Sequence, residues 1–250
     1  MDKVVREGDG GRSIAAGHGP LVPARVPWGV LDGLAAVAFS LLVQGAFGLI
    51  LAAGPDDLAA QLKAGAASYA AVLAAVWAMV RLRSGGGAAK LLGLKAAGLR
   101  AAISGCVAAA AGAAAYLAVH QAFGAVLYCL NMGWEDVPRQ PLVRLIAQAG
   151  SARLVWLSVA VGVILAPVAE EVLFRSVLYL PLRARWGVLP AAVAVSVLFA
   201  AMHAYPWGTP MLFVLGLTFT ALFESTGTLW APILAHSLYN GIMVLLVRMA

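Results

Sequence analysis

Charge is what this sequence has least of. Only 11% of its 250 residues are charged, whereas 62% are hydrophobic, and the mean hydropathy is +0.90. Such a chain has too few polar side chains to cover a water-soluble surface. The composition therefore excludes an ordinary soluble domain and predicts an integral membrane protein in a lipid bilayer.

Other absences narrow the class further. The alternation of apolar and polar residues that marks a membrane β-barrel is missing, so the spans are expected to be helices. Cysteine is scarce, and Cys106 and Cys129 lack metal-type spacing, which predicts unpaired packing residues. The net charge of +6 does not indicate nucleic acid binding, because the basic residues cluster at the ends of apolar runs, where they report topology.

Apolar runs long enough to cross a hydrocarbon core of about 30 Å recur along the chain. They predict an all-α, polytopic transmembrane helix bundle of about seven spans (six to eight). The expected spans are residues 28–53, 67–80, 101–130, 154–180, 189–203, 211–224 and 229–247. We divide the chain into a flexible basic N-terminal tail (1–27), accessory transmembrane helices and loops (28–153) and a C-terminal transmembrane core (154–248).

The distribution of basic residues predicts the orientation. Five basic residues and no acidic one lie between Arg81 and Arg100, which marks that loop as cytoplasmic. Alternating the sides along the chain puts the N-terminus in the cytoplasm as well. The Ala- and Gly-rich composition favours a bacterial source, so we expect a multi-pass protein of the inner (plasma) membrane.

Against this apolar background, Glu170, Glu171 and Arg175 stand inside a predicted span. An ionised group at membrane depth costs about 2.5 to 3.5 kcal/mol even on mild insertion scales, so such groups pair, face the interior and carry function. Later spans add His203 in one helix and His236 with Asn240 in another. Packing alone hardly explains four polar residues at compatible depth in three helices, namely Glu170, His203, His236 and Asn240.

Helix geometry predicts how these side chains meet. Glu170 lies about 15 Å, and His203 about 20 Å, from the helix ends that share one short loop, so their depths match. Glu171 and Arg175 are four residues apart and can form a charge-assisted pair, which leaves Glu170 without an in-helix partner and suited to act as a general base. A plain folding clamp is the alternative reading of the Glu171–Arg175 pair.

The motifs of several other membrane chemistries are missing. The sequence has no HExxH for zinc, no GxGD for an aspartyl site and no GxSx serine with an evident partner. A proton-coupled transporter with Glu170 as the relay passes this screen, although no internal inverted repeat is visible. A catalytically silent membrane scaffold or immunity regulator also stays open.

Three pieces in a fixed order carry a family resemblance: Glu170-Glu171-x-x-x-Arg175, Phe199-x-x-x-His203 and His236-x-x-x-Asn240. Together with the tract from Gly216 to His236, they resemble the CAAX-protease and bacteriocin-processing (CPBP, or Abi) family of intramembrane endopeptidases. The resemblance covers about residues 159–243 and implies that the transmembrane core, residues 154–248, is the catalytic core.

The resemblance implies hydrolysis of a peptide bond in a membrane-tethered protein or peptide. It implies that Glu170 activates the water, that His203 helps to hold it, and that His236 and Asn240 stabilise the oxyanion. Glu171 and Arg175 would orient the site. We favour no metal or other cofactor; if the reaction is metal-dependent, Glu170, His203 and His236 are the candidate ligands of a divalent ion such as zinc.

Overall fold

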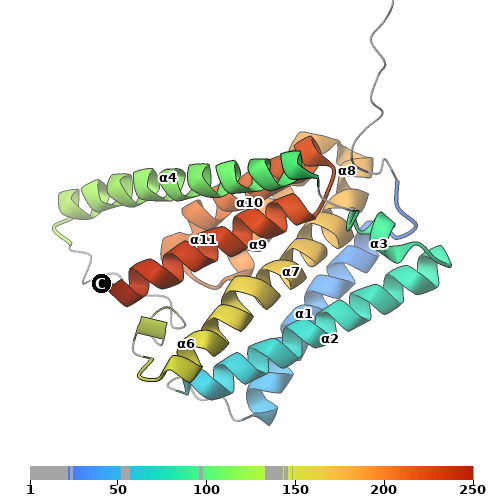
Figure 1. Cartoon of the computed structure of the whole chain (residues 1–250). Helices are drawn as coiled ribbons and strands as arrows, with labels where there is room; N and C mark the ends of the chain where they lie inside the picture. The colour runs from blue at the N-terminus through green and yellow to red at the C-terminus, as the bar shows by residue number, and fades with distance from the viewer. Residues whose placement is uncertain are drawn as a thin grey trace, which may run out of the picture.

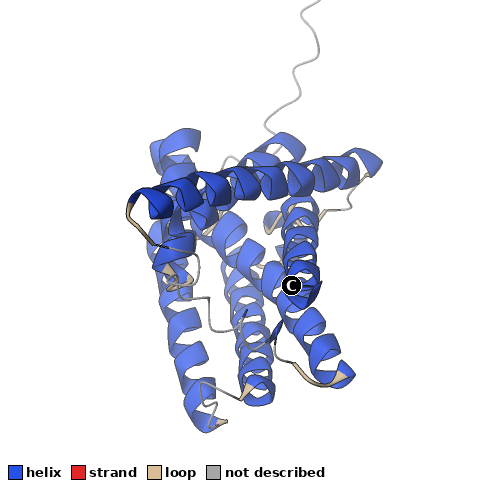
Figure 2. Cartoon of the chain, turned by 90° about the vertical axis from the view of Figure 1, so that its left-hand side faces the viewer, coloured by secondary structure: helices blue, strands red, loops and turns tan. Residues whose placement is uncertain are grey.

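The computed structural model describes residue 22 and residues 25–51, 57–95, 98–132, 143, 146–147 and 149–249. The expected flexible tail, residues 1–27, lies almost wholly outside the described residues. All regular structure in the described ranges is helical, and the helices pack side by side as a bundle (Figures 1 and 2). This confirms the predicted all-α fold class.

Six of the helices are long and apolar enough to cross a membrane, and α9 is a shorter apolar helix. The fourth membrane span is assembled from five consecutive helical segments, α6 to α8. The elements are α1 (Val30–Ile50), α2 (Leu58–Ser84), α3 (Ala88–Leu91), α4 (Leu99–Cys129), α6 (Ala152–Ser158), η2 (Val159–Leu165), α7 (Ala166–Glu171), η3 (Val172–Tyr179), α8 (Leu180–Trp186), α9 (Val188–Met202), η4 (Pro206–Gly208), α10 (Thr209–Thr226) and α11 (Trp230–Met249).

The predicted spans lie within a few residues of these helices, except that the fourth span continues to Trp186 instead of ending at residue 180, and α2 begins early. That helix begins at Leu58 rather than near residue 67, because the Asp57 side chain accepts a hydrogen bond from the Ala60 amide and caps the first turn. Its first turns also contain Gln61 and Lys63, polar residues that hydropathy excludes from a span but that helices accept readily. At the other end, Gly85 adopts φ 66°, the left-handed conformation that ends many helices.

The segment from α6 to α8 runs through the middle of the bundle, with α1 and α2 on one side and α9, α10 and α11 on the other (Figure 1). Its residues from 171 to 182 are all buried. Helix α4 packs against α10 and α11 (Figure 1). Outward-facing leucines such as Leu42 and Leu117 are exposed, as expected for faces that contact lipid.

Two short stretches of the central span, η2 and η3, are π-helical, and they lie on either side of α7, which carries the paired glutamates. A π-helical turn holds an extra residue, so it widens the helix and changes the direction of the side chains that follow. Such turns are frequent at functional sites. The central span is therefore irregular where its charged residues lie.

The packing of α9 against α10 can be tested at a close contact, between Ser196 and Gly216. A Cβ atom at Gly216 would lie 2.9 Å from the Ser196 Cβ and 3.0 Å from its Cα, so Gly216→Ala must push the helices apart. We expect a loss of about 1 to 3 kcal/mol in unfolding free energy, measured by thermal unfolding in detergent. Gly45→Ala is the control, because nothing lies within 4 Å of its added Cβ. Equal shifts of the melting temperature in Gly216→Ala and Gly45→Ala would contradict the close contact between α9 and α10.

Candidate active site

The two adjacent glutamates of α7 lie in different environments. The Glu171 side chain is 0% exposed, whereas that of Glu170 is 17% exposed and lines cavities. Neighbouring residues on a helix point about 100° apart, so one can enter the packed core while the other faces an open space. Only Glu170 is placed to meet a substrate or a water molecule.

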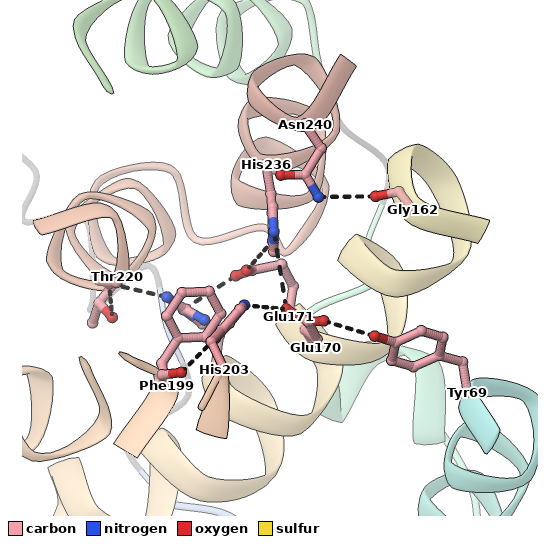
Figure 3. A network of polar contacts seen from close by, with 11 residues as sticks. Tyr69, Gly162, Glu170, Glu171, Phe199, His203, Thr220, His236 and Asn240 are labelled. Carbon is pink, nitrogen blue, oxygen red and sulfur yellow. Dashed lines mark hydrogen bonds and ion pairs between the residues drawn. The ribbon is translucent and has the colours of Figure 1, made fainter. Parts of the chain in front are cut away.

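Three side chains from three other helices surround the Glu170 carboxylate (Figure 3). Tyr69 of α2 donates its hydroxyl hydrogen to Oε1 over 3.1 Å. The Oε2 atom lies 3.8 Å from Nε2 of His203 and 3.9 Å from Nε2 of His236, and among the described residues it accepts no hydrogen bond. One carboxylate oxygen is therefore held, and the other faces two imidazoles.

His203 directly follows α9, as its C-terminal capping residue. Its Nδ1 lies 2.7 Å from the Phe199 carbonyl oxygen, one turn earlier. A carbonyl oxygen only accepts hydrogen bonds, so Nδ1 must carry the proton and Nε2 of the neutral ring keeps its lone pair. That lone pair is available on the side of Glu170.

His236 of α11 is oriented in the same way by a different partner. Its Nδ1 lies 2.9 Å from Oε1 of Glu171, and a carboxylate also only accepts, so Nδ1 donates here too. The ring stacks on Phe219, with centroids 4.8 Å apart and an interplanar angle of 21°. Glu171, the buried glutamate, thus fixes the orientation of the His236 ring, which faces Glu170.

Glu171 is balanced by a fully buried Arg175. The Nε of Arg175 lies 3.1 Å from Oε2 of Glu171, in an ion pair that lacks the alignment of a hydrogen bond. The guanidinium also donates to the Gly216 carbonyl over 3.0 Å and lies 4.9 Å from the centroid of the Phe199 ring. The predicted Glu171–Arg175 pair is therefore present, and it also connects to His236.

Asn240 contacts a backbone carbonyl that Pro167 leaves without its helical partner. In η2 the Ala166 amide bonds to the Val161 carbonyl, five residues back. The next bond of that pattern would run from residue 167 to Gly162, but proline has no N–H. The Asn240 side-chain nitrogen donates to the Gly162 oxygen instead, over 2.8 Å (Figure 3). This contact uses one of its two N–H groups.

Two cavities meet at Glu170 and His203. A cavity of about 190 Å³ is also lined by Ser40, Gln44 and Tyr69, which give it a polar wall. A second cavity, of about 240 Å³, contains His236 and Asn240 and is otherwise bounded mainly by apolar side chains of α10 and α11. All four predicted catalytic residues thus line one cavity, and two of them also face the polar one.

Glu170, His203 and His236 are of residue types that can ligate a divalent cation, but among the described residues no three or more His, Cys, Asp or Glu side chains are arranged to hold a metal ion. Glu170 offers an unpartnered carboxylate oxygen, and both imidazoles present Nε2 while Nδ1 donates to protein oxygens. A ring fixed by a hydrogen bond at its other nitrogen is the usual state of a metal-binding histidine. Our preference for a reaction without metal therefore stays a prediction.

Tyr69, whose hydroxyl contacts Glu170, was not singled out by the sequence analysis. It lies in the predicted accessory region, where no motif marks it. A tyrosine in an apolar helix is common, and its contact with Glu170 joins residues 101 positions apart. Only the depth of Tyr69 in its span, comparable to that of Glu170, offered a signal.

Together the fold and the site define a polytopic helical membrane protein with a glutamate and two histidines around internal cavities. Residues 152–242, which contain all six predicted site residues, match the family described as "Type II CAAX prenyl endopeptidase Rce1-like". The "Putative membrane peptidase YdiL" of Bacillus subtilis (strain 168) is 28% identical over 119 residues, or 48% of this chain and 46% of that protein. No solved structure matches the chain.

These similarities agree with the resemblance seen in the motifs. Both similarities support a CPBP-family assignment, which rests on residues 152–242. The match to the curated relative spans less than half of that protein's length. The division of the chain into tail, accessory region and catalytic core stays a prediction.

The buried ion pair can be tested by removing one charge. Arg175→Met leaves Glu171 without its guanidinium at 0% exposure, and we expect a loss of about 3 to 5 kcal/mol in unfolding free energy. Adding Glu171→Gln removes the stranded charge and should recover part of the loss. Thermal unfolding of both variants measures the difference. A double variant less stable than Arg175→Met would argue against the pair as the origin of the effect.

The contact of Asn240 with Gly162 can be tested by a double-mutant cycle. Asn240→Leu strands the Gly162 carbonyl and should cost about 1 to 3 kcal/mol of stability. Pro167→Ala supplies the missing N–H, so the same Asn240→Leu change should cost less in that background. Chemical denaturation in mixed micelles would measure all four proteins. If the stability costs of Asn240→Leu and Pro167→Ala simply add, the hydrogen bond from Asn240 to Gly162 does not compensate for the missing N–H of Pro167.

Proposed function

We propose that this protein is an intramembrane endopeptidase that hydrolyses a peptide bond of a membrane-tethered protein or peptide. The observation that carries the proposal is the free Oε2 of Glu170, which faces Nε2 of His203 and of His236 at 3.8 and 3.9 Å inside a cavity. A base, two imidazoles and room for a substrate at membrane depth are what such hydrolysis needs. The family match supports the same reaction class.

In the proposed reaction, Glu170 takes a proton from a water molecule as its oxygen attacks the carbonyl carbon. His203, whose Nε2 can accept a hydrogen bond, helps to hold the water. The carbonyl oxygen becomes an oxyanion, which Asn240 stabilises with its second N–H and His236 with Nε2–H when the ring is protonated. Glu170 then passes the proton to the leaving nitrogen, the C–N bond breaks, and an acid and an amine are formed.

Glu171 and Arg175 act through His236 in this scheme. The carboxylate of Glu171 accepts from Nδ1 and fixes the direction of the ring, and Arg175 compensates the buried charge. A carboxylate behind a catalytic imidazole plays this part in serine proteases as well. Neither residue lines the cavities, so both are assigned as positioning residues.

The substrate role and the orientation belong to the same proposal. A bacterial protein of this kind would process a peptide or bacteriocin, confer immunity, or trim a C-terminal sorting anchor. We propose the inner membrane as its location, with the N-terminus in the cytoplasm. One end of the bundle collects the start of α1 and the end of α2, joined by Arg83 and Asp32 at 2.7 Å, and the basic Arg81–Arg100 stretch begins there.

The decisive experiment removes the proposed base without changing its shape. Glu170→Gln, purified in detergent, should cleave a library of membrane-tethered peptides about 100-fold or more slowly than the wild type. Asp57→Asn is the matched control, because Asp57 caps α2 at the surface and asparagine caps equally well. Repeating the assay with a chelator tests the preference for a reaction without metal.

The outcomes separate the alternatives. Loss of cleavage in Glu170→Gln, with chelator resistance in the wild type, supports the metal-free glutamate mechanism. Chelator-sensitive cleavage that returns on adding zinc would make Glu170, His203 and His236 metal ligands instead. A folded wild type that cleaves nothing would favour a silent scaffold or immunity regulator, and proton uptake that depends on Glu170 would favour a transporter.

A further inference from the structure

Tyr69, in the N-terminal half of the chain, contacts Glu170 through a hydrogen bond. It lies on α2, outside the residues that match the family, and its hydroxyl donates to Oε1 of Glu170 over 3.1 Å. Its side chain lines both the polar cavity and the apolar one. In Figure 3 the ring approaches Glu170 from the side opposite to the two histidines. The glutamate is thus held between Tyr69 and the imidazoles.

The structure around Tyr69 brings α2 close enough for this contact. A Cβ at Gly65, one turn earlier, would lie 3.6 Å from a Val161 methyl of η2 and 4.0 Å from the Tyr69 ring. Val72, less than a turn later, is 2% exposed and belongs to the main core. The backbone of α2 is therefore fixed on both sides of the tyrosine, and its hydroxyl has a defined position.

The carboxylate of a glutamate needs such a contact to hold one orientation. Rotation about its last side-chain bond is broad, with no sharp preferred angle. Of its two oxygens, Oε1 accepts the Tyr69 hydrogen bond and Oε2 accepts none from the described residues. Without Tyr69, the carboxylate could turn and carry Oε2 away from the two Nε2 atoms. Small displacements of reacting atoms are expensive in catalysis.

We propose that Tyr69 is a positioning residue of the hydrolytic site: it holds Oε1 of Glu170 so that Oε2 faces His203, His236 and the attacking water. This inference rests on the proposed function, because it assigns Tyr69 a part in the same reaction. It also makes α2 part of the catalytic unit, so that residues 152–242 alone form an incomplete site.

The test compares Tyr69→Phe with the wild type and with Glu170→Gln in the tethered-peptide assay. Loss of the hydroxyl should lower kcat by about 10- to 100-fold, the range of a hydrogen bond to a charged group, with KM and the melting temperature nearly unchanged. Tyr128→Phe is the control, because Tyr128 is 83% exposed on α4, and it should behave like the wild type. In the Glu170→Gln background, Tyr69→Phe should cause no further loss.

A second readout does not depend on cleavage. Dicyclohexylcarbodiimide, an apolar reagent that modifies membrane-embedded carboxyl groups, can be followed at Glu170 by mass spectrometry. Tyr69→Phe should label severalfold faster, because Oε1 is no longer covered, whereas Tyr128→Phe should not change the rate. A kcat equal to that of the wild type would overturn the proposal, as would a lowered melting temperature with unchanged labelling, which would reduce Tyr69 to a packing residue.

Failure of the proposed function would look different. If Glu170→Gln cleaved as fast as the wild type, the glutamate mechanism would fall, and the role of Tyr69 in it as well, whatever the labelling showed. If Glu170→Gln were inactive while Tyr69→Phe kept full activity, the protease mechanism would stand and only the assignment of Tyr69 would fail.

Discussion

The buried charge of Glu171 is the constraint on which the centre of this protein depends. A carboxylate at 0% exposure in an apolar bundle must be compensated, and Arg175 at 3.1 Å and His236 at 2.9 Å do so from two helices. Arg175 in turn needs the Gly216 carbonyl and the faces of Phe199 and Phe219, which come from α10 and α9. Satisfying one charge thus fixes the relative positions of α7, η3, α9, α10 and α11. The site of Glu170 is built on that arrangement. Glu170 is available for chemistry because the neighbouring Glu171 makes the structural contacts.

Backbone hydrogen bonding sets a second condition. In a bilayer no water is available to satisfy an open carbonyl, so every break in a helix needs a protein partner. Pro167 and the widened turns of η2 and η3 create such breaks next to the glutamates, and Asn240 satisfies one of them at Gly162. The same asparagine lines the apolar cavity with its amide. Irregular backbone and polar side chains therefore occur together, because the polar side chain supplies the hydrogen bond that the interrupted helix does not make.

Much of the fold and part of the site could be predicted from the sequence. Hydropathy located the spans, and counting residues from the shared loop placed Glu170 and His203 at similar depth, in agreement with their 3.8 Å separation. The spacing of Glu171 and Arg175 predicted their pair. The link from Glu171 to His236 could not be predicted, because it depends on the rotation of α11 about its axis. Tyr69 escaped for a similar reason: periodicity says which face of α2 is buried but not which neighbour it meets. The roles of these residues in catalysis stay predictions.

The length of α9 has a consequence for the bilayer itself. Its 15 residues measure about 22 Å along the axis, against about 30 Å for a typical hydrocarbon core. An upright helix of this length would end short of one surface of such a core, at the turn from His203 to Gly208. In that orientation, lipids next to the turn would have to thin or tilt to avoid burying its open backbone groups. The depression this leaves in the membrane would shorten the path between bulk water and His203.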